Sequence, residues 1–290
     1  MDFGLCLPNF RDGSSAEGLD AAAEVAERFG WSTVWTTDHV VVAHATEAEY
    51  GRVYEAILTL AWLAGRHPGV RLGTSVIVVP QRNAVLLAKE LSTLDSLSGG
   101  RVTAGIGVGW NTAEFGNLAM SDRFHVRGSY LDETIRLWRH LWSGATEPFH
   151  GRFHILEDFT FGPRPVQDVL PILIGGTAVP ALQRAGRLAD GYHASSTSPA
   201  RLAEMIPIVT AAATAAGRAA PSVSARARVR FAGAADDSYA LRGTPDTMAA
   251  EVRAYAALGV DHVALSFAAV DPAGIVAEAE RFQREVVPLV

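Results

Sequence analysis

Short apolar runs alternate with longer stretches of helical periodicity along most of the chain. The first pair is a strand predicted over residues 3–8 and a helix over residues 16–29, whose apolar residues recur on one helical face. Residues 70–79 are rich in Val and Ile, as expected for a parallel strand covered on both faces. The other strands are predicted over residues 33–36, 101–107, 172–174, 191–194, 223–231 and 262–267. The other helices are predicted over residues 54–64, 84–97, 127–142, 180–188, 199–216, 245–258 and 272–287.

This order of elements predicts an α/β fold, the (β/α)8 TIM barrel. An open doubly wound sheet also alternates strands and helices, but eight such units in 290 residues is the count that closes a barrel. No linker or fixed-period repeat divides the chain, so we expect a single domain over residues 1–290. Prolines, glycines and alternating aromatic residues interrupt the pattern, and we expect an insertion containing a hairpin at about residues 143–170.

Composition narrows the class of protein. A hydrophobic content of 49% with only 19% charged residues excludes a disordered chain. The net charge of −6, without runs of like charge, argues against nucleic acid as a partner. We find no signal peptide and no apolar run of about 18 residues or more, and therefore predict a cytoplasmic protein that does not span a membrane. Cys6 is the single cysteine, so no intramolecular disulfide is expected.

The carboxyl ends of the predicted strands, where barrel enzymes place their sites, hold few reactive side chains. The only lysine, Lys89, falls within a predicted helix, which excludes a Schiff-base aldolase. We find no metal-binding pattern, no recurring carboxylate pair and no GxSxG motif, and predict no metal site. Chemistry supplied by a cofactor suits such a barrel, and hydride transfer is the leading case.

Two kinds of feature do occur at these strand ends. Glycine-rich loops at 105–109 and 175–177 let a ligand approach the main chain and offer N–H groups to a phosphate. The alternative is that these glycines only turn strands into helices. Asp38 and His39 follow the second predicted strand, and a histidine there can exchange protons near neutral pH. The alternative is that Asp38 caps a turn while His39 packs under the loop 40–53.

Six segments of the sequence form a recognisable combination. In chain order they are 35–39 (WTTDH), 71–76 (RLGTSV), 94–102 (LDSLSGGRV), 105–115 (GIGVGWNTAEF), 171–176 (PILIGG) and 189–192 (ADGY). With this combination the chain resembles the luciferase-like monooxygenase superfamily. It is most similar to the branch that uses coenzyme F420, an 8-hydroxy-5-deazaflavin.

The resemblance implies a barrel that holds a flavin or deazaflavin ring at its mouth. It implies a non-prolyl cis peptide between Ser75 and Val76 behind the ring and a hydrogen bond between Asp38 and the ring. It places His39, as the catalytic residue, near the reactive face of the ring or the substrate. Main-chain N–H groups of the glycine loops would bind the cofactor tail. The implied cofactor-binding residues are Asp38, Ser75, Val76, Gly107, Val108, Gly109, Gly175, Gly176 and Thr177.

One departure concerns the substrate. Deazaflavin-dependent sugar-phosphate dehydrogenases have a glutamate where this chain has Trp110, which favours an apolar substrate here. Glu114 is the nearest carboxylate, and we interpret it as structural.

Three functions are compatible with the resemblance. The first is an F420-dependent oxidoreductase that transfers a hydride to or from an unidentified small molecule. The second is an FMN-dependent monooxygenase, and the third a non-catalytic flavin-binding barrel. The apolar stretches 56–64 and 86–97 are expected to form a homodimer interface, although burial against the barrel explains the same residues.

Overall fold

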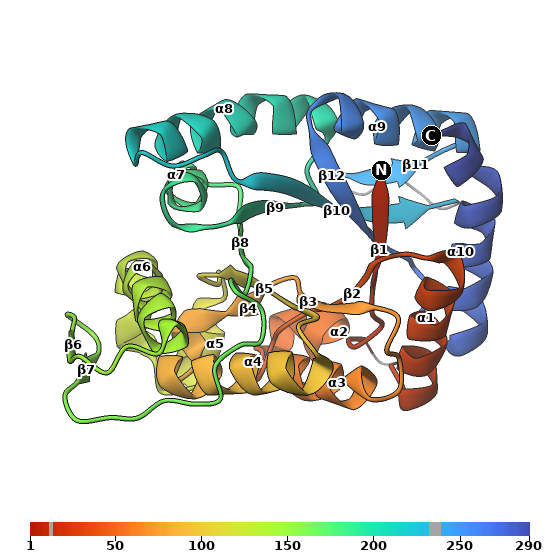
Figure 1. The fold of residues 1–290 in the computed structure, drawn as a ribbon. Coiled ribbons are helices and arrows are strands. Elements are labelled where there is room, and N and C mark those ends of the chain that lie inside the picture. Colours follow the sequence, from red (N-terminus) through yellow and green to blue (C-terminus); the bar gives the residue numbers. More distant parts are fainter. Residues whose placement is uncertain (12–13, 232–238) are drawn as a thin grey trace.

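Eight parallel strands close into a barrel in the computed structural model, which describes residues 1–11, 14–231 and 239–290 (Figure 1). β1 (Asp2–Cys6) pairs with β2 (Thr33–Thr36) on one side and with β12 (Val260–Ser266) on the other, which completes the circle. The remaining wall strands are β3 (Arg71–Thr74), β5 (Val102–Gly107), β8 (Ile172–Gly175), β9 (Gly191–Ser195) and β10 (Ser222–Arg230). The predicted (β/α)8 barrel is confirmed.

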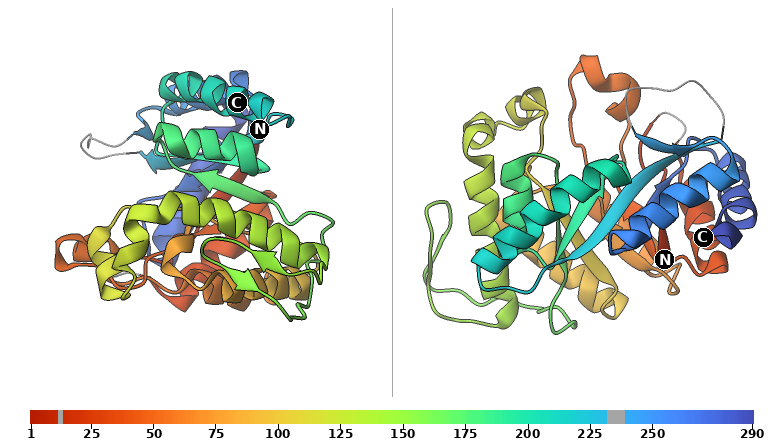
Figure 2. Two further views of the ribbon diagram at one scale, coloured as in Figure 1. Left: turned by 90° about the vertical axis from the view of Figure 1, so that its left-hand side faces the viewer. Right: turned by 90° about the horizontal axis from the view of Figure 1, so that it is seen from above.

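Helices surround this wall, as Figures 1 and 2 show. At the start of the helix over residues 16–29, the Ser15 hydroxyl accepts a hydrogen bond from the Gly18 N–H, and Gly30 ends this helix with a φ of 67°. The long helices are α1 (Ala16–Phe29), α3 (Ala56–Ala64), α4 (Ala84–Ser98), α6 (Ser121–Ser143), α7 (Val179–Leu188), α8 (Pro199–Ala215), α9 (Pro245–Ala257) and α10 (Pro272–Glu285). In the described ranges, no helix combines the length and apolar content that a membrane span requires.

The predicted strand 70–79 is interrupted. β3 ends at Thr74, and β4 (Ile77–Val78) resumes pairing with β5. Between the register pairs on either side, this strand carries one more residue than β5, so Ser75 and Val76 form a bulge. Apolar content alone cannot reveal such a break, because the residues on both sides of it are buried.

Other bounds differ near the barrel mouth. The helix predicted from residue 54 begins at Ala56, because the Glu55 carboxylate caps it by accepting the Leu58 N–H. The loop before it contains a 3₁₀ turn (His44–Thr46) and α2 (Glu47–Tyr50). α6 begins earlier than predicted and follows α5 (Thr112–Asn117).

One short strand was not predicted. β11 (Ala240–Arg242) pairs with β10 outside the barrel, and its three residues are too few to show a periodicity. The predicted strand end at 231–232 lies partly outside the described residues, because Ala232 belongs to the gap at 232–238.

The segment 143–170 leaves the barrel, as predicted, and contains a small hairpin. β6 (Phe149–His150) pairs antiparallel with β7 (Ile155–Leu156). The Glu133 carboxylate of α6 accepts the N–H groups of Arg152, Phe153 and His154, which fastens the hairpin to α6. Farther along the segment, the Lys89 ammonium of α4 lies 4.6 Å from the ring centroid of Phe161 and donates to the Gly162 carbonyl.

Part of the barrel interior is polar. His193 is fully buried, stacks on Trp35 at 4.9 Å, and hydrogen-bonds Ser75 and Ser224 through its two ring nitrogens. Burial, with repulsion from His262 and Arg226, lowers the pKa of His193 to about 3, so its ring is neutral.

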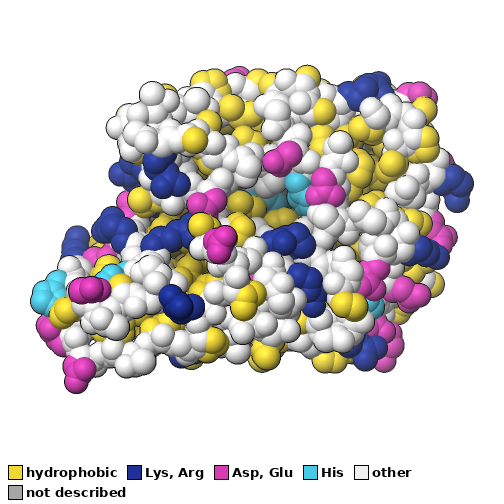
Figure 3. All heavy atoms as spheres, in the orientation of Figure 1, with side chains coloured by type: hydrophobic (Ala, Val, Ile, Leu, Met, Phe, Trp, Pro, Cys, Tyr) yellow, Lys and Arg dark blue, Asp and Glu magenta, His cyan; other side chains and the backbone are white. Residues whose placement is uncertain are grey.

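The two ends of the barrel differ. A pocket of about 350 Å³ opens where the strands begin, and its lining includes Asp2, Arg71 and His262. Figure 3 shows a hollow near the middle of one face, with histidine and acidic side chains around it. Asp38, His39 and the glycine loops lie at the opposite end, where the strands terminate.

Candidate active site

His39 and Glu114 form a buried pair at the barrel mouth. His39 follows the end of β2, and its Nδ1 lies 2.9 Å from Oε2 of Glu114 on α5. The other carboxylate oxygen accepts the Val40 N–H at 2.6 Å. An ionised carboxylate only accepts hydrogen bonds, so we place the His39 proton on Nδ1. Among the described residues nothing hydrogen-bonds Nε2, which is left for a ligand.

The charge of Glu114 is set by its neighbours. Burial raises the pKa of Glu114, but hydrogen bonds from His39 and the Val40 N–H outweigh burial and hold the pKa below its ordinary value of 4.5. The carboxylate is therefore ionised at neutral pH and accepts the hydrogen bond from Nδ1 of His39. Our sequence interpretation of Glu114 as structural missed this contact, because the Glu114 partner is far away in the chain.

Aromatic side chains flank His39. The ring centroid of Tyr50 lies 4.2 Å from that of His39, and Trp110 approaches edge-on at 6.1 Å. Phe10 stacks on the other side of Tyr50 at 6.2 Å. Trp110 is 60% exposed, so it presents a large apolar surface beside the His39 ring. This geometry suits the apolar substrate that Trp110 suggested.

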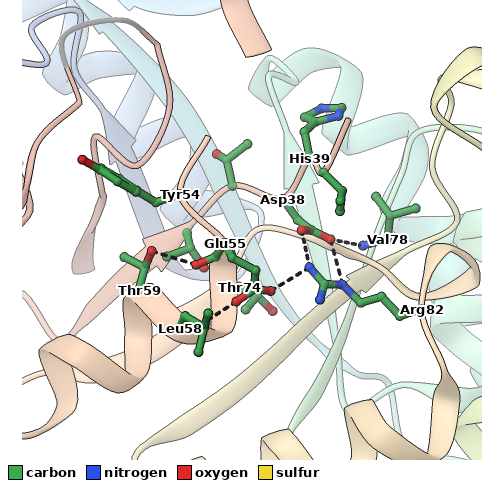
Figure 4. A network of polar contacts seen from close by, with 12 residues as sticks. Asp38, His39, Tyr54, Glu55, Leu58, Thr59, Thr74, Val78 and Arg82 are labelled. Atoms are coloured by element: carbon green, nitrogen blue, oxygen red, sulfur yellow. Dashed lines mark hydrogen bonds and ion pairs between the residues drawn. The ribbon is translucent and has the colours of Figure 1, made fainter. Parts of the chain in front are cut away.

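Asp38 points away from His39, as Figure 4 shows. Its Oδ1 lies 2.6 Å from Nη2 of Arg82, and its Oδ2 accepts the Val78 N–H at 2.9 Å. Arg82 also pairs with Glu55 at 2.8 Å. Both Asp38 oxygens thus bind groups of the protein and hold β4 in place. The hydrogen bond from Asp38 to a cofactor ring stays a prediction.

The Ser75–Val76 peptide is cis, as the resemblance implied. The Val76 side chain lies among glycines of β5 and β8. A Cβ on Gly107 would lie 2.8 Å from Cγ2 of Val76, and a Cβ on Gly175 would lie 2.9 Å from Cγ1. These two glycines therefore make room for the bulge, a reason that neither alternative in the sequence analysis had considered.

The remaining predicted positions expose main chain near the mouth. Val108 and Gly109 follow β5, and Gly109 has a φ of 75°. Gly176 and Thr177 are exposed just before α7, whose N-cap residue Ala178 makes no side-chain capping bond. In the first turn of α7, Pro180 has no N–H, and the Ala181 and Leu182 N–H groups donate to the Ala178 carbonyl. The N–H groups of residues 176–179, just before this turn, are therefore the candidates for binding an anion.

Arg226 is a site residue that the sequence analysis did not single out. Its Nη1 donates to the Ser75 carbonyl at 2.7 Å and its Nη2 to the Thr37 hydroxyl at 3.1 Å. Arginines alternate with the buried residues Ala225, Ala227 and Val229 along β10. That alternation in a predicted barrel strand was a usable signal for charged side chains on one face.

A buried amide beside Glu114 suits a ligand. Asn111 caps α5 through its Oδ1, and its buried Nδ2 has no hydrogen-bond partner among the described residues. Gln81 is 4% exposed, and its side chain lies close enough to Glu114 to help lower the pKa of that carboxyl. Buried amides usually have a partner, so Nδ2 of Asn111 suits a bound polar molecule.

Comparisons with known proteins indicate the family of this chain. Residues 1–242 match the profile of a family described as luciferase-like monooxygenase. The chain is 30% identical over 222 residues to an F420-dependent glucose-6-phosphate dehydrogenase of Kineococcus radiotolerans, covering 76% of this chain and 65% of that protein. The enzyme of the same name in Amycolatopsis mediterranei is 30% identical over 226 residues, with coverages of 76% and 66%. The chain thus spans slightly less than two thirds of the length of these relatives.

Solved structures share the whole fold. An F420-dependent secondary alcohol dehydrogenase in complex with an F420-acetone adduct superposes with a TM-score of 0.83 at 18% identity, covering 100% of this chain and 98% of that one. The oxygenating constituent of 3,6-diketocamphane monooxygenase from Pseudomonas putida, in complex with FMN, gives a TM-score of 0.81 at 15% identity, with coverages of 99% and 98%. At these identities the likeness shows the fold alone.

Proposed function

The chain belongs to the luciferase-like monooxygenase family, and from that premise we propose that it is an F420-dependent oxidoreductase acting on a small apolar alcohol or carbonyl compound. The observation that carries this proposal is the His39–Glu114 pair at 2.9 Å, which leaves Nε2 of His39 without a hydrogen-bond partner among the described residues. The F420-dependent names of its relatives support the choice of cofactor. The proposed enzyme works on a small molecule in the cytoplasm.

The residues of the mouth fit a deazaflavin. On this proposal Ser75, Val76 and Gly107 lie against the ring, and Asp38 fixes their position through Val78. The cofactor tail is bound by main-chain N–H groups of Val108, Gly109, Gly175, Gly176 and Thr177. When bound, the deazaflavin accepts or returns a hydride.

His39 handles the proton that accompanies the hydride. In the oxidation of an alcohol, Nε2 takes the hydroxyl proton as the C–H bond breaks, and in the reverse direction it returns that proton to the carbonyl oxygen. Glu114 accepts the Nδ1–H and so leaves Nε2 as the nitrogen that takes up the proton. Tyr50 and Trp110 exclude water and hold the apolar part of the substrate.

An FMN-dependent monooxygenase is the second candidate, favoured by the FMN-bound structural neighbour. The start of α7 offers backbone rather than basic side chains, which favours F420. Retention of Asp38, His39 and both glycine loops argues against a non-catalytic flavin-binding barrel. Isothermal titration calorimetry of the protein with F420 and with FMN tests the choice. We expect tighter binding of F420, and tighter binding of FMN would contradict the proposal.

A control variant ties binding to the predicted tail site. Gly176 has a φ of 125° and is exposed before α7, so Gly176→Val crowds the helix start and distorts its backbone. This variant should bind F420 more weakly than the wild type while retaining its circular dichroism spectrum.

We also propose that the protein forms a homodimer through α3 and α4. Ile57, Leu60 and Leu63 of α3 are buried, so burial against the barrel explains only one face of that helix. The outer faces still expose large apolar side chains: Leu58 (70%), Trp62 (41%), Leu86 (56%) and Leu97 (80%). An apolar surface of this kind is typical of a protein interface.

A further inference from the structure

Arg226 lies inside the barrel directly beneath the mouth. It is half-buried, and its guanidinium is fixed by two hydrogen bonds, one to the Ser75 carbonyl and one to the Thr37 hydroxyl. Both partners immediately follow wall strands, β3 and β2. The cation therefore has a defined position under the Ser75–Val76 bulge.

No carboxylate pairs with Arg226 in the part of the chain that the structure describes. The acidic side chains of the mouth have other partners. Asp38 binds Arg82, Glu49 binds Arg228 and Glu114 binds His39. His193, on the other side of Ser75, is neutral and supplies no counter-charge. A cation held in place at the mouth without a counter-ion is available to a ligand that carries negative charge.

The proposed hydride transfer places such a negative charge on the bound cofactor. When an alcohol is oxidised, its C–H bond gives up a hydride, which carries two electrons to the ring, while its hydroxyl proton goes to His39. The substrate leaves as a carbonyl compound, and the ring has gained one negative charge. A planar guanidinium suits a charge that is spread over a planar ring.

We propose that Arg226 is the counter-charge for the reduced cofactor, a role that rests on the function proposed above. We choose the cofactor rather than an anionic substrate because of the two groups that accept hydrogen bonds from the guanidinium. Ser75 belongs to the predicted cofactor site, and Thr37 adjoins Asp38. The substrate side of the mouth is lined instead by His39, Tyr50 and Trp110. Because its two anchors fix it before the charge arrives, Arg226 stabilises that charge without reorganisation.

The test compares the two redox states of the cofactor. Dissociation constants for oxidised and for reduced F420 are measured under anaerobic conditions for the wild type, Arg226→Gln and Arg226→Lys, together with the midpoint potential of the bound cofactor. Arg284→Gln removes the same charge from an exposed position on α10 and serves as the control. Circular dichroism establishes that each variant is folded.

We expect Arg226→Gln to weaken binding of reduced F420 about tenfold to a hundredfold relative to oxidised F420, which is the effect of losing one charge-assisted hydrogen bond. The midpoint potential should fall accordingly. Arg226→Lys keeps the charge and should restore most of the ratio, whereas Arg284→Gln should leave it unchanged.

A wrong role for Arg226 and a wrong proposed function give different results. If the wild type binds both redox states and Arg226→Gln keeps the wild-type ratio, the role of Arg226 is overturned while the proposed function stands. If Arg226→Gln does not fold, the test rests on Arg226→Lys. A ratio of the dissociation constants for reduced and oxidised F420 equal to that of the wild type then supports the role. A change in this ratio as large as that expected for Arg226→Gln overturns it. A wild type that binds neither F420 nor FMN overturns the proposed function and the role of Arg226 with it.

Discussion

The carboxylate that positions His39 comes from α5. Glu114 lies in the first turn of that helix, and Asn111 caps the turn by accepting the Glu114 N–H. The turn thus aims the carboxylate back at His39 and at the Val40 N–H. Trp110, just before the turn, is free to present its ring to the mouth. Proton handling and the apolar wall are therefore provided by neighbouring residues of one short segment.

His39→Gln should lower turnover without removing the cofactor. General acid–base catalysis contributes about 10²- to 10⁴-fold, and we expect a loss of kcat in that range. The dissociation constant for F420 should change little, since Glu114 and Asn111 still shape the mouth. His44→Gln is the matched control, because His44 lies in the same loop with its side chain fully exposed. Unchanged turnover in His39→Gln would remove His39 from the mechanism.

Glu114→Gln should lower turnover while the cofactor still binds. The carboxylate can only accept a hydrogen bond and so keeps the proton of His39 on Nδ1, whereas an amide can also turn its NH₂ group toward Nδ1 and favour the other tautomer. In that tautomer Nε2 carries the proton and cannot accept one, so we expect kcat to fall by about tenfold or more. An unchanged kcat would indicate a purely structural Glu114.

The packing of β5 against the Ser75–Val76 bulge can be tested by substitution. The Cβ of Gly107→Ala would lie 2.8 Å from Cγ2 of Val76, so we expect a loss of unfolding free energy of about 1–3 kcal/mol. Val76→Ala removes the opposing methyl groups and should recover part of that loss in the double variant. Urea unfolding of both single variants and the double variant measures the coupling. Additive effects would contradict direct packing of Val76 on Gly107.

The hairpin of the insertion should loosen in acid. Burial raises the pKa of Glu133, but the N–H groups of Phe153 and Arg152 and the side chain of His154 outweigh burial and hold the pKa below its ordinary value of 4.5. Because the folded-state pKa is lowered, this stabilisation is present at neutral pH and is lost as the pH falls through the lowered pKa. Glu133→Gln should mimic that loss at pH 7.

Limited proteolysis checks the hairpin prediction. Cleavage between β6 and β7 should be faster in Glu133→Gln than in the wild type at neutral pH, while the melting temperature of the barrel changes less. Equal cleavage rates would show that other contacts hold the hairpin.

The sequence predicted elements with clear local signals well. α1 and β2 have the predicted bounds, because a capping serine, a terminal glycine and apolar periodicity are all local. Glu114 and Arg226 were beyond such reasoning, since their roles depend on His39 and Ser75, which are distant in the chain. The two glycines 107 and 175 were noticed, but their packing on Val76 appears only when β3, β5 and β8 are side by side.

The exposed outer faces of α3 and α4 make the proposed dimer testable. Leu58 and Leu86 are 70% and 56% exposed, and charges at both positions should prevent an apolar interface from forming. We expect Leu58→Glu with Leu86→Glu to be monomeric in light scattering and the wild type to be dimeric. Val169→Glu, at an equally exposed site in the insertion, should leave the dimer intact. A monomeric wild type would contradict the proposed interface.

The contact of Lys89 with the insertion has a practical consequence. Lys89 is the only lysine in the chain, and its ammonium lies over the Phe161 ring and against the Gly162 carbonyl. An amine-reactive reagent has one lysine side chain to modify, and that side chain is half-buried and its ammonium is hydrogen-bonded while the insertion stays in place. The rate of acylation at Lys89, followed by mass spectrometry, therefore reports how often the insertion lifts from α4, without any engineered label.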